Sequence, residues 1–274
     1  LRFPRIIISM LAGAAIAVSG VLFQAVLKNS LADPGIIGIS SGASFTAVII
    51  TAFAPTLYFF TPIAAFAGGV IAFFMVYCLS WKGGLSPMRI ILTGVAVNSL
   101  FTGLSSALNS MSGGDRTGVA AIVEANITQK TWDDVMTLLP YVIAGLFLAM
   151  LFTQECNLLS LEDKTARSLG VNVNVTRIVI SLVAVLLASI STAVAGAISF
   201  LGLIVPHIGR ILVGSDHKML LPFSAVFGAF TFLLADTIGR TIAAPNEVSA
   251  AVIMSVVGGP FFILLLRRSG KYGK

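Results

Sequence analysis

The sequence predicts an all-α fold, a polytopic transmembrane helical bundle with about nine spans in this chain. Composition is the first reason: 57% of the residues are hydrophobic, 10% are charged, and the mean hydropathy is +1.00. An ordinary soluble domain carries about a quarter charged residues. A chain this poor in charge cannot cover its own surface in water, so its solvent is lipid. The second reason is that apolar residues form long continuous runs, not the alternating pattern of a membrane barrel.

A helix needs about 20 predominantly apolar residues to cross a bilayer. Runs of roughly this length, some of them shorter, follow one another along the chain with brief loops between them. We expect helices at Ile6–Leu27, Ile39–Ala54, Thr61–Ser80, Met88–Asn109, Thr137–Thr153, Val175–Ala195, Ala197–Val213, Leu221–Ile238 and Val248–Leu266. Nothing resembles a separate soluble domain. The chain is therefore predicted to be one transmembrane domain, residues 1–274, with a cytoplasmic loop at 156–174.

Basic residues set the predicted orientation, because Lys and Arg concentrate in cytoplasmic loops. They are scattered singly despite a net charge of +6, which argues against a nucleic-acid partner. The tail 267–274 is expected to be cytoplasmic. Counting back, the loops on its side hold Lys28, Lys82, Lys164, Arg167 and Lys218. With an odd number of spans the N-terminal arginines would lie outside, so we expect the complete protein to have one more span.

Polar residues in the fourth run are candidates for a translocation path. Asn98, Thr102, Ser105 and Asn109 are four, three and four residues apart, which places them on one helix face. Amides are costly to bury in lipid, so this face meets another helix or a water-filled path. Interhelical hydrogen bonding would explain the pattern equally well. The residues alone leave both interpretations open.

Three arginines, Arg2, Arg5 and Arg240, fall near the predicted outer face, where positive charge is disfavoured. Such cations fit acidic partners, lipid phosphates, or a local pair with Asp236. Asp236 is also the one carboxylate that could serve an intramembrane ion relay. An ion-gradient-driven secondary transporter is therefore an alternative, and it would have to use Asp236. A membrane scaffold without transport is a second alternative.

The longest predicted cytoplasmic loop, residues 157–172, has the pattern of a short amphipathic helix. Ser160 with Asp163 resembles an N-cap and capping box, and Gly170 is typical of a helix stop. Leu161 and Leu169 would be available for docking on a partner. A helix that merely lies at the membrane interface gives the same pattern.

The sequence contains none of the catalytic motifs that would make this chain an enzyme. It has no G-x-x-x-x-G-K-[ST] loop for ATP and no Ser/His/Asp or H-E-x-x-H arrangement. Cys78 and Cys156 lie far apart, with no metal-ligand spacing. We expect no ATPase site, metal or cofactor in this chain. If it transports actively, its energy comes from a separate subunit.

Several segments, in order along essentially the whole chain, form a specific set of patterns: Arg2–Arg5 (R-x-P-R), Ser19–Gln24 (S-G-x-x-x-Q), Asn29–Ala43 (N-P-L-A-D-P-x-x-L-G-x-S-S-G-A), Ala166–Gly170 (A-R-x-L-G), Ala195–His207 (containing G-x-I-x-F-x-G-L-x-x-P-H), Leu234–Asp236, Arg240 and Gly258–Phe262. Together they resemble the FecCD family of ABC-importer permeases. Two departures stand out. Ser30 replaces the usual Pro, and Val248–Ala251 stands where L-P-V-G is common.

The resemblance implies ten helices in the complete subunit, in a bacterial cytoplasmic membrane, with a cytoplasmic C-terminus. It implies import of an iron chelate (siderophore or haem) or cobalamin by alternating access. The implied partners are a second permease, identical or paralogous, two cytoplasmic ATPases that hold ATP and Mg²⁺, and an extracytoplasmic binding protein.

The resemblance also assigns roles to residues. The loop that couples the permease to the ATPase would contain Glu162, Ala166, Arg167, Leu169 and Gly170. Arg2, Arg5 and Arg240 would receive acidic residues of the binding protein. The helix from Asn98 to Asn109 and the last helix would line the path.

Overall fold

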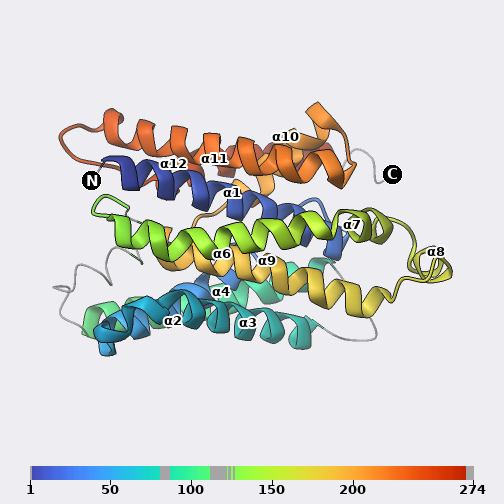
Figure 1. Ribbon diagram of the computed structural model, residues 1–274, viewed down its shortest axis with the longest axis horizontal. Helices are drawn as coiled ribbons and strands as arrows, with labels where there is room; N and C mark the ends of the chain where they lie inside the picture. Colours follow the sequence, from blue (N-terminus) through green and yellow to red (C-terminus); the bar gives the residue numbers. More distant parts are fainter. Residues whose placement is uncertain (1, 81–86, 112–121, 123–124, 126, 270–274) are drawn as a thin grey trace.

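The computed structural model describes residues 2–80, 87–111, 122, 125 and 127–269 (Figure 1). All regular structure in this part of the chain is helical, which confirms the predicted fold class. The helices are α1 (Arg2–Leu27), α2 (Ile39–Phe53), the 3-10 helix η1 (Pro55–Phe60), α3 (Thr61–Ser80), α4 (Pro87–Met111), α6 (Trp132–Leu151), α7 (Thr153–Leu159), α8 (Asp163–Ser168), α9 (Val173–Ala195), α10 (Leu201–Val213), α11 (His217–Ile242) and α12 (Ala250–Ser269).

Each predicted apolar run contains a helix, but the helices differ in their capacity to span a bilayer. In the described part of the chain, six are long and apolar enough: α1, α3 with the preceding η1, α4, α6, α9 and α11. The other three, α2, α10 and the apolar part of α12, are shorter. With 13 residues, α10 is about 20 Å long, less than the ~30 Å hydrocarbon core. The predicted count of nine spans is therefore not confirmed.

The centre of the bundle is built on α1, which packs against α6, α9, α10 and α11 (Figure 1). Small residues let the backbones approach closely, as is common between membrane helices. A Cβ atom on Gly13 would lie 2.4 Å from the Gly228 carbonyl oxygen of α11. One on Gly20 would lie 2.0 Å from the Gly202 carbonyl oxygen of α10. These contacts fix both helices against α1.

The bundle has two ends: one carries α8, and α1 begins at the other (Figure 1). We name them the α8 end and the Arg5 end, after Arg5 in the first turns of α1. At the α8 end, Lys28 lies 2.8 Å from Asp163, and Asn157 hydrogen-bonds Asp216 at 2.8 Å. The three loops that were predicted to share a side, those with Lys28, with Lys164 and Arg167, and with Lys218, therefore lie at one end of the bundle. The loop with Lys82, residues 270–274 of the tail, and most of the predicted outer loop 112–130 lie outside the described residues.

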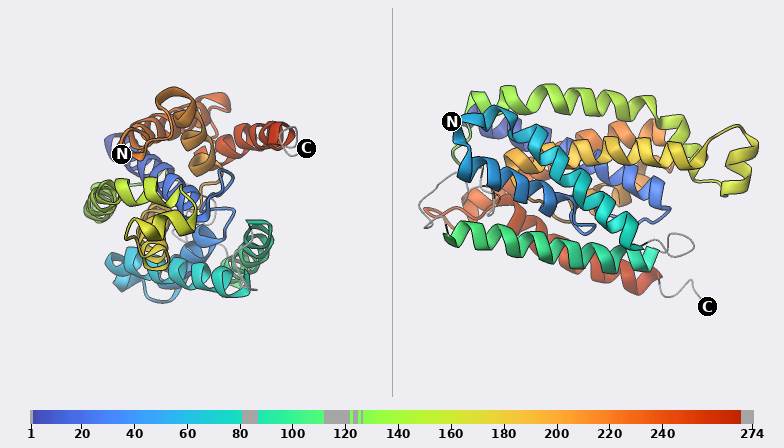
Figure 2. Two further views of the ribbon diagram at one scale, coloured as in Figure 1. Left: turned by 90° about the vertical axis from the view of Figure 1, so that its right-hand side faces the viewer. Right: turned by 90° about the horizontal axis from the view of Figure 1, so that it is seen from below.

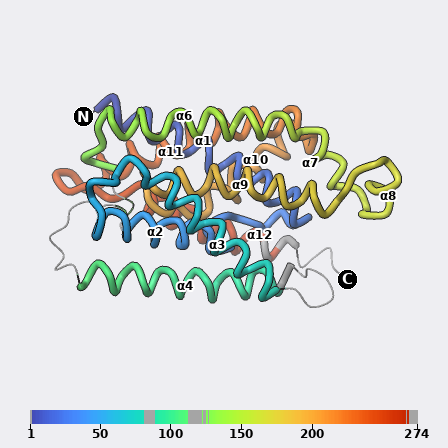
Figure 3. The backbone as a smooth tube through the Cα atoms, turned by 60° about the horizontal axis from the view of Figure 1, so that its bottom comes forward, coloured from blue at the N-terminus to red at the C-terminus, as the bar shows by residue number. Residues whose placement is uncertain are grey.

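Two helices, α4 and α12, lie at the rim on the same side of the bundle (Figure 2, left). Within the described chain, α4 contacts α2 and α3, whereas α12 contacts α10 and α11. Figure 3 shows α4 running along the edge of the molecule. Both helices expose large apolar side chains, among them Leu92 and Leu100 of α4 and Val256 and Ile263 of α12. Their outer faces are therefore free for lipid or a partner helix.

Candidate functional site

Three of the four polar residues predicted for a path line one cavity. Asn98, Thr102 and Ser105 of α4 face the start of α2 and the segment before α10. The cavity measures about 470 Å³ including its mouth, and its walls comprise Gly35, Ser40, Ser41, Ser44, Asn98, Thr102, Ser105, Ala197 and Ser199. Asn109 lies further along α4 and is not among these residues.

The cavity is weakly polar and uncharged: the residues that line it carry hydroxyl groups, one side-chain amide and, at Gly35 and Ala197, no polar side chain. The hydroxyls of Ser40 and Ser105 are buried without a hydrogen-bond partner among the described residues. Ser41, by contrast, donates to the Gly38 carbonyl at 2.9 Å. Buried hydroxyls are costly to leave unpaired. Neither hydroxyl bonds another helix among the described residues, and the path interpretation of the α4 face stays a prediction.

Sequence reasoning did not assign the serines of α2 to this site. Ser40 and Ser44 are four residues apart within an apolar run, the same kind of spacing that singled out α4. That signal was available. The contribution of Ser199 was not, because it comes from an irregular segment between α9 and α10.

The turn between α1 and α2 forms a wall of this region. Asp33 is fully buried, and its Oδ1 accepts hydrogen bonds from the backbone N–H groups of Gly35 at 2.8 Å and Ile36 at 3.3 Å. The Gln24 amide donates to the carbonyls of Ala32 and Gly202, at 3.2 and 3.1 Å. The turn is thereby tied to both α1 and α10.

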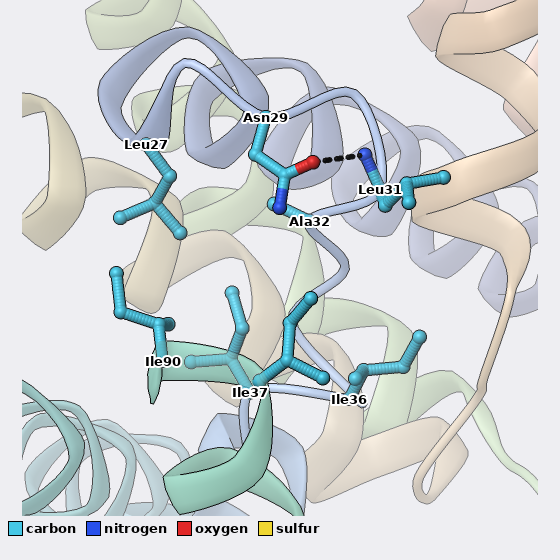
Figure 4. A pocket seen from close by; sticks show the side chains of 8 residues that line it. Leu27, Asn29, Leu31, Ala32, Ile36, Ile37 and Ile90 are labelled. Carbon is cyan, nitrogen blue, oxygen red and sulfur yellow. Dashed lines mark hydrogen bonds between the residues drawn. The ribbon is translucent and has the colours of Figure 1, made fainter. Parts of the chain in front are cut away.

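Ser30 stands at the position where the family usually has Pro, and the turn is held without it. Asn29 Oδ1 accepts from the Leu31 N–H at 3.0 Å, a bond drawn in Figure 4 above a small apolar cavity. Leu27 and Ile90 also line that cavity, so the turn packs on the start of α4. A side-chain hydrogen bond of this type fixes a turn locally.

The loop predicted to couple the chain to an ATPase protrudes, with α8, at one end of the bundle (Figure 1). Of the residues predicted for coupling, Ala166 is buried, whereas Glu162, Arg167, Leu169 and Gly170 are exposed. Leu169 is 60% exposed. It lies directly after the last residue of α8.

Asp163 ties the loop to the bundle, a role that sequence analysis did not assign. Its carboxylate accepts from Lys28 at 2.8 Å and from Arg177 at 2.9 Å. The hydrogen bond from Lys28 holds the pKa of Asp163 below its ordinary value. These two ion pairs connect the start of α8 to Lys28, which follows α1, and to Arg177 in the first turns of α9.

The two predicted boundaries of this short helix had different outcomes. The N-cap at Ser160 was wrong: α8 begins at Asp163, and Ser160 Oγ donates to the Asn157 carbonyl of α7 at 2.6 Å. The stop at Gly170 is confirmed. Gly170 has φ +86°, its N–H bonds the Arg167 carbonyl, and the next N–H bonds the Ala166 carbonyl. Glycine adopts this left-handed conformation without the Cβ penalty.

The Arg5 end contains a cluster of buried charges. Arg5 Nη2 donates to Asp236 Oδ1 at 2.7 Å, and Arg5 Nε lies 3.0 and 3.1 Å from the two Asp236 oxygens. Arg5 Nη1 donates to Glu247 Oε2 at 2.8 Å. Arg240 Nε lies 3.5 Å from Asp236 Oδ2. The side chains of Arg5 and Asp236 are 7% and 1% exposed.

These contacts place the three predicted docking arginines in different environments. Arg2 is exposed, Arg240 is partly exposed, and Arg5 is buried with carboxylates of its own chain. The local pair between Arg240 and Asp236, considered from sequence, is present. Asp236 is enclosed by two guanidinium groups, which makes it a fixed counterion and gives no support to an ion relay.

The fold and the site define a polytopic membrane protein of the transporter type, with a polar cavity inside and a protruding helix at one end. The chain belongs to the FecCD transport family, which matches residues 1–268.

Relatives of this chain include two bacterial permeases. It is 40% identical over 277 residues to the Iron(3+)-hydroxamate import system permease protein FhuG of Bacillus subtilis (strain 168), covering 98% of this chain and 82% of the relative. It is 41% identical over 269 residues to the "Probable heme-iron transport system permease protein IsdF" of Staphylococcus aureus (strain Newman), covering 98% and 81%.

Two solved structures are also similar. One, described as an inward-facing metal-chelate type ABC transporter, has a TM-score of 0.84 at 28% identity, covering 97% of this chain and 87% of that one. The other, PsaBC from Streptococcus pneumoniae in complex with Fab, has a TM-score of 0.67 at 19% identity, covering 95% and 89%. The second likeness concerns the fold alone.

Proposed function

We propose that this chain is the permease subunit of an ATP-driven ABC importer that moves an iron chelate, a siderophore or haem, across the cytoplasmic membrane by alternating access. The observation that carries the proposal is its family membership over residues 1–268, with 40% and 41% identity to two permeases named for such import. Because these relatives are named for iron-hydroxamate and haem-iron, we propose an iron chelate as the cargo and not cobalamin.

A second permease subunit, identical or paralogous, would complete the path. The exposed apolar faces of α4 and α12 support this part of the proposal, because they lie on the same side of the bundle as two rims (Figure 2). If a partner subunit covers them, the cavity lined by Asn98, Thr102 and Ser105 would lie near the interface between the two subunits. Asn109 and α12 would extend the lining of that path. Weakly polar, uncharged walls would let a large ligand pass without trapping it.

Energy would come from two cytoplasmic ATPases that bind ATP and Mg²⁺, while this chain holds no cofactor. They would dock on the loop 156–174, through Glu162, Ala166, Arg167, Leu169 and Gly170. The exposure of Leu169 and Arg167 supports this contact. The ion pairs of Asp163 would pass a movement of α8 to the bundle.

An extracytoplasmic binding protein would deliver the chelate at the Arg5 end. Arg2 and Arg240 have exposed surface for acidic residues of that protein. Arg5 is buried and already paired with Asp236 and Glu247, so it would take part in docking only if one of these carboxylates leaves it.

The test is uptake into proteoliposomes. The complete subunit, reconstituted with its ATPase and with binding protein outside, is expected to accumulate a ferric hydroxamate or haem only when ATP is enclosed, and ionophores should not abolish uptake. A partner ATPase with its catalytic residue replaced is the matched control. Uptake that follows an imposed ion gradient without the ATPase would contradict the proposal.

A further inference from the structure

Arg5 holds two carboxylates of unequal accessibility. Asp236 is 1% exposed and lies within the bundle on α11, whereas the Glu247 side chain is 37% exposed. Glu247 belongs to the segment between α11 and α12, and Thr128 also donates to its Oε2 at 2.8 Å. These groups border a small cavity that opens between Arg5, Thr128 and Glu247. One carboxylate is thus built in, and the other reaches in from a surface loop.

The charges of the cluster balance only while Glu247 is in place. Arg5 and Arg240 contribute two positive charges, and Asp236 and Glu247 two negative ones. If Glu247 swings out, one positive charge is left, and Arg5 Nη1 loses its partner beside the cavity. Arg240 Nε is already buried without a hydrogen bond among the described residues. If Glu247 leaves, the site therefore has the place and the charge for one other carboxylate.

Glu247 is the replaceable member of the pair. Only the Glu247 side of its pair with Arg5 reaches solvent, so water can solvate Glu247 once it leaves, whereas Asp236 has no access to water and stays with Arg5. The hydrogen bond from Arg5 keeps the pKa of Glu247 below its ordinary value, so protonation does not release it near neutral pH. Release requires a competing carboxylate.

Exchange of Glu247 would act on α12, which starts three residues later at Ala250. The neighbouring Val248 is fixed to α11, with its N–H on the Gly239 carbonyl at 3.0 Å. A Cβ atom on Gly239 would lie 2.2 Å from the Val248 carbonyl oxygen, so this seat is tight. Removing Glu247 from Arg5 would release the start of α12 from α1, while the contact between Val248 and Gly239 of α11 would remain.

We infer that Glu247 is an internal place-holder, which occupies Arg5 in the unpartnered permease and is exchanged for an acidic side chain of the extracytoplasmic binding protein. This rests on the proposed function. It gives Arg5 a part in docking that its burial alone would deny, and it links docking to the start of α12.

The experiment measures binding-protein affinity for the complete transporter in nanodiscs. Glu247→Gln removes the competitor but keeps the shape, and the affinity is expected to rise about two- to fivefold, the range for an exposed ion pair. Asp133→Asn is the matched control: it removes one negative charge from an exposed side chain at the same end, which has no contact with Arg5. Its affinity should match wild type.

A second readout follows the loop itself. A polarity-sensitive dye on Asn246→Cys, in a Cys78→Ser background, should change its emission when the binding protein docks. With Glu247→Gln the change should already be present before docking. If Glu247→Gln and Asp133→Asn bind the binding protein with equal affinity, or if the emission of the dye does not change on docking, the proposed exchange is wrong. Failure of the binding protein to bind wild type at all would overturn the proposed function together with it.

Discussion

Asp236→Asn is expected to destabilise the protein strongly, because it removes one charge from a buried ion pair. The Arg5 side chain is 7% exposed and Asp236 is 1% exposed, so neither can turn to water. Arg5 would lose a carboxylate that accepts from both its Nε and its Nη2. Glu247 would remain as its one acidic partner among the described residues, at 2.8 Å.

The magnitude follows from this geometry. Breaking a buried pair by removing one partner costs about 3–5 kcal/mol. Because Glu247 still compensates part of the Arg5 charge, we place the loss near the lower limit, at about 3 kcal/mol. Replacing both partners by apolar residues removes the two most buried charges and leaves Glu247 and Arg240, whose side chains are 37% and 27% exposed. The double variant Arg5→Met with Asp236→Leu should therefore be more stable than Asp236→Asn alone.

The assay is reversible unfolding of the purified complete subunit in mixed micelles, read by circular dichroism for wild type, each single variant and the double variant. Asp133→Asn, at an exposed position of the same end, should stay within about 0.5 kcal/mol of wild type. If Asp236→Asn is as stable as this control, the buried pair is not held as described. If the double variant loses the sum of the single losses, Arg5 and Asp236 do not act as a pair.

Three further changes test other parts of the structure. Gly20→Ala places a Cβ 2.0 Å from the Gly202 carbonyl oxygen and should cost about 3 kcal/mol or more, whereas Gly103→Ala, with nothing within 4 Å, should be neutral in the same unfolding assay. Asn98→Leu should lower chelate uptake severalfold without changing ATPase association, because it removes a polar group from the cavity; unchanged uptake would contradict the path assignment. Asp163→Asn should weaken the coupling of ATP hydrolysis to uptake. Since its folded pKa is lowered, the ionised form contributes above the unfolded value of about 3.9 and is lost only as pH falls through the folded value, so wild-type coupling should not vary through Asp163 between pH 6 and 8.

The helices could be predicted from the apolar runs, but several of their ends could not. The run starting at Thr137 belongs to α6, which begins at Trp132. Its first turn is polar, and Asp134 accepts from the Thr131 N–H at 2.8 Å. Hydropathy ends where the lipid ends, whereas a helix continues as long as its backbone bonds are satisfied. A capping pattern read beside the apolar run would have found this start.

The candidate site was predictable where its residues share one helix. The α4 face could be read from spacing alone, and so could the pair of Arg240 with Asp236, four residues apart. Arg5 and Glu247 are 242 positions apart, and no local sequence pattern predicts their contact. Sequence assigned Arg5 to an exposed docking role because burial of its side chain is a property of the tertiary packing.

The central claim, that this chain is an importer subunit driven through its α8 end, is tested most directly by ATP hydrolysis. The complete subunit would be purified with its ATPase, reconstituted in lipid, and assayed with and without the binding protein, for wild type and for Arg167→Glu. The account predicts that the binding protein stimulates hydrolysis in wild type and that Arg167→Glu loses the associated ATPase. A wild-type subunit with which no ATPase associates would contradict it.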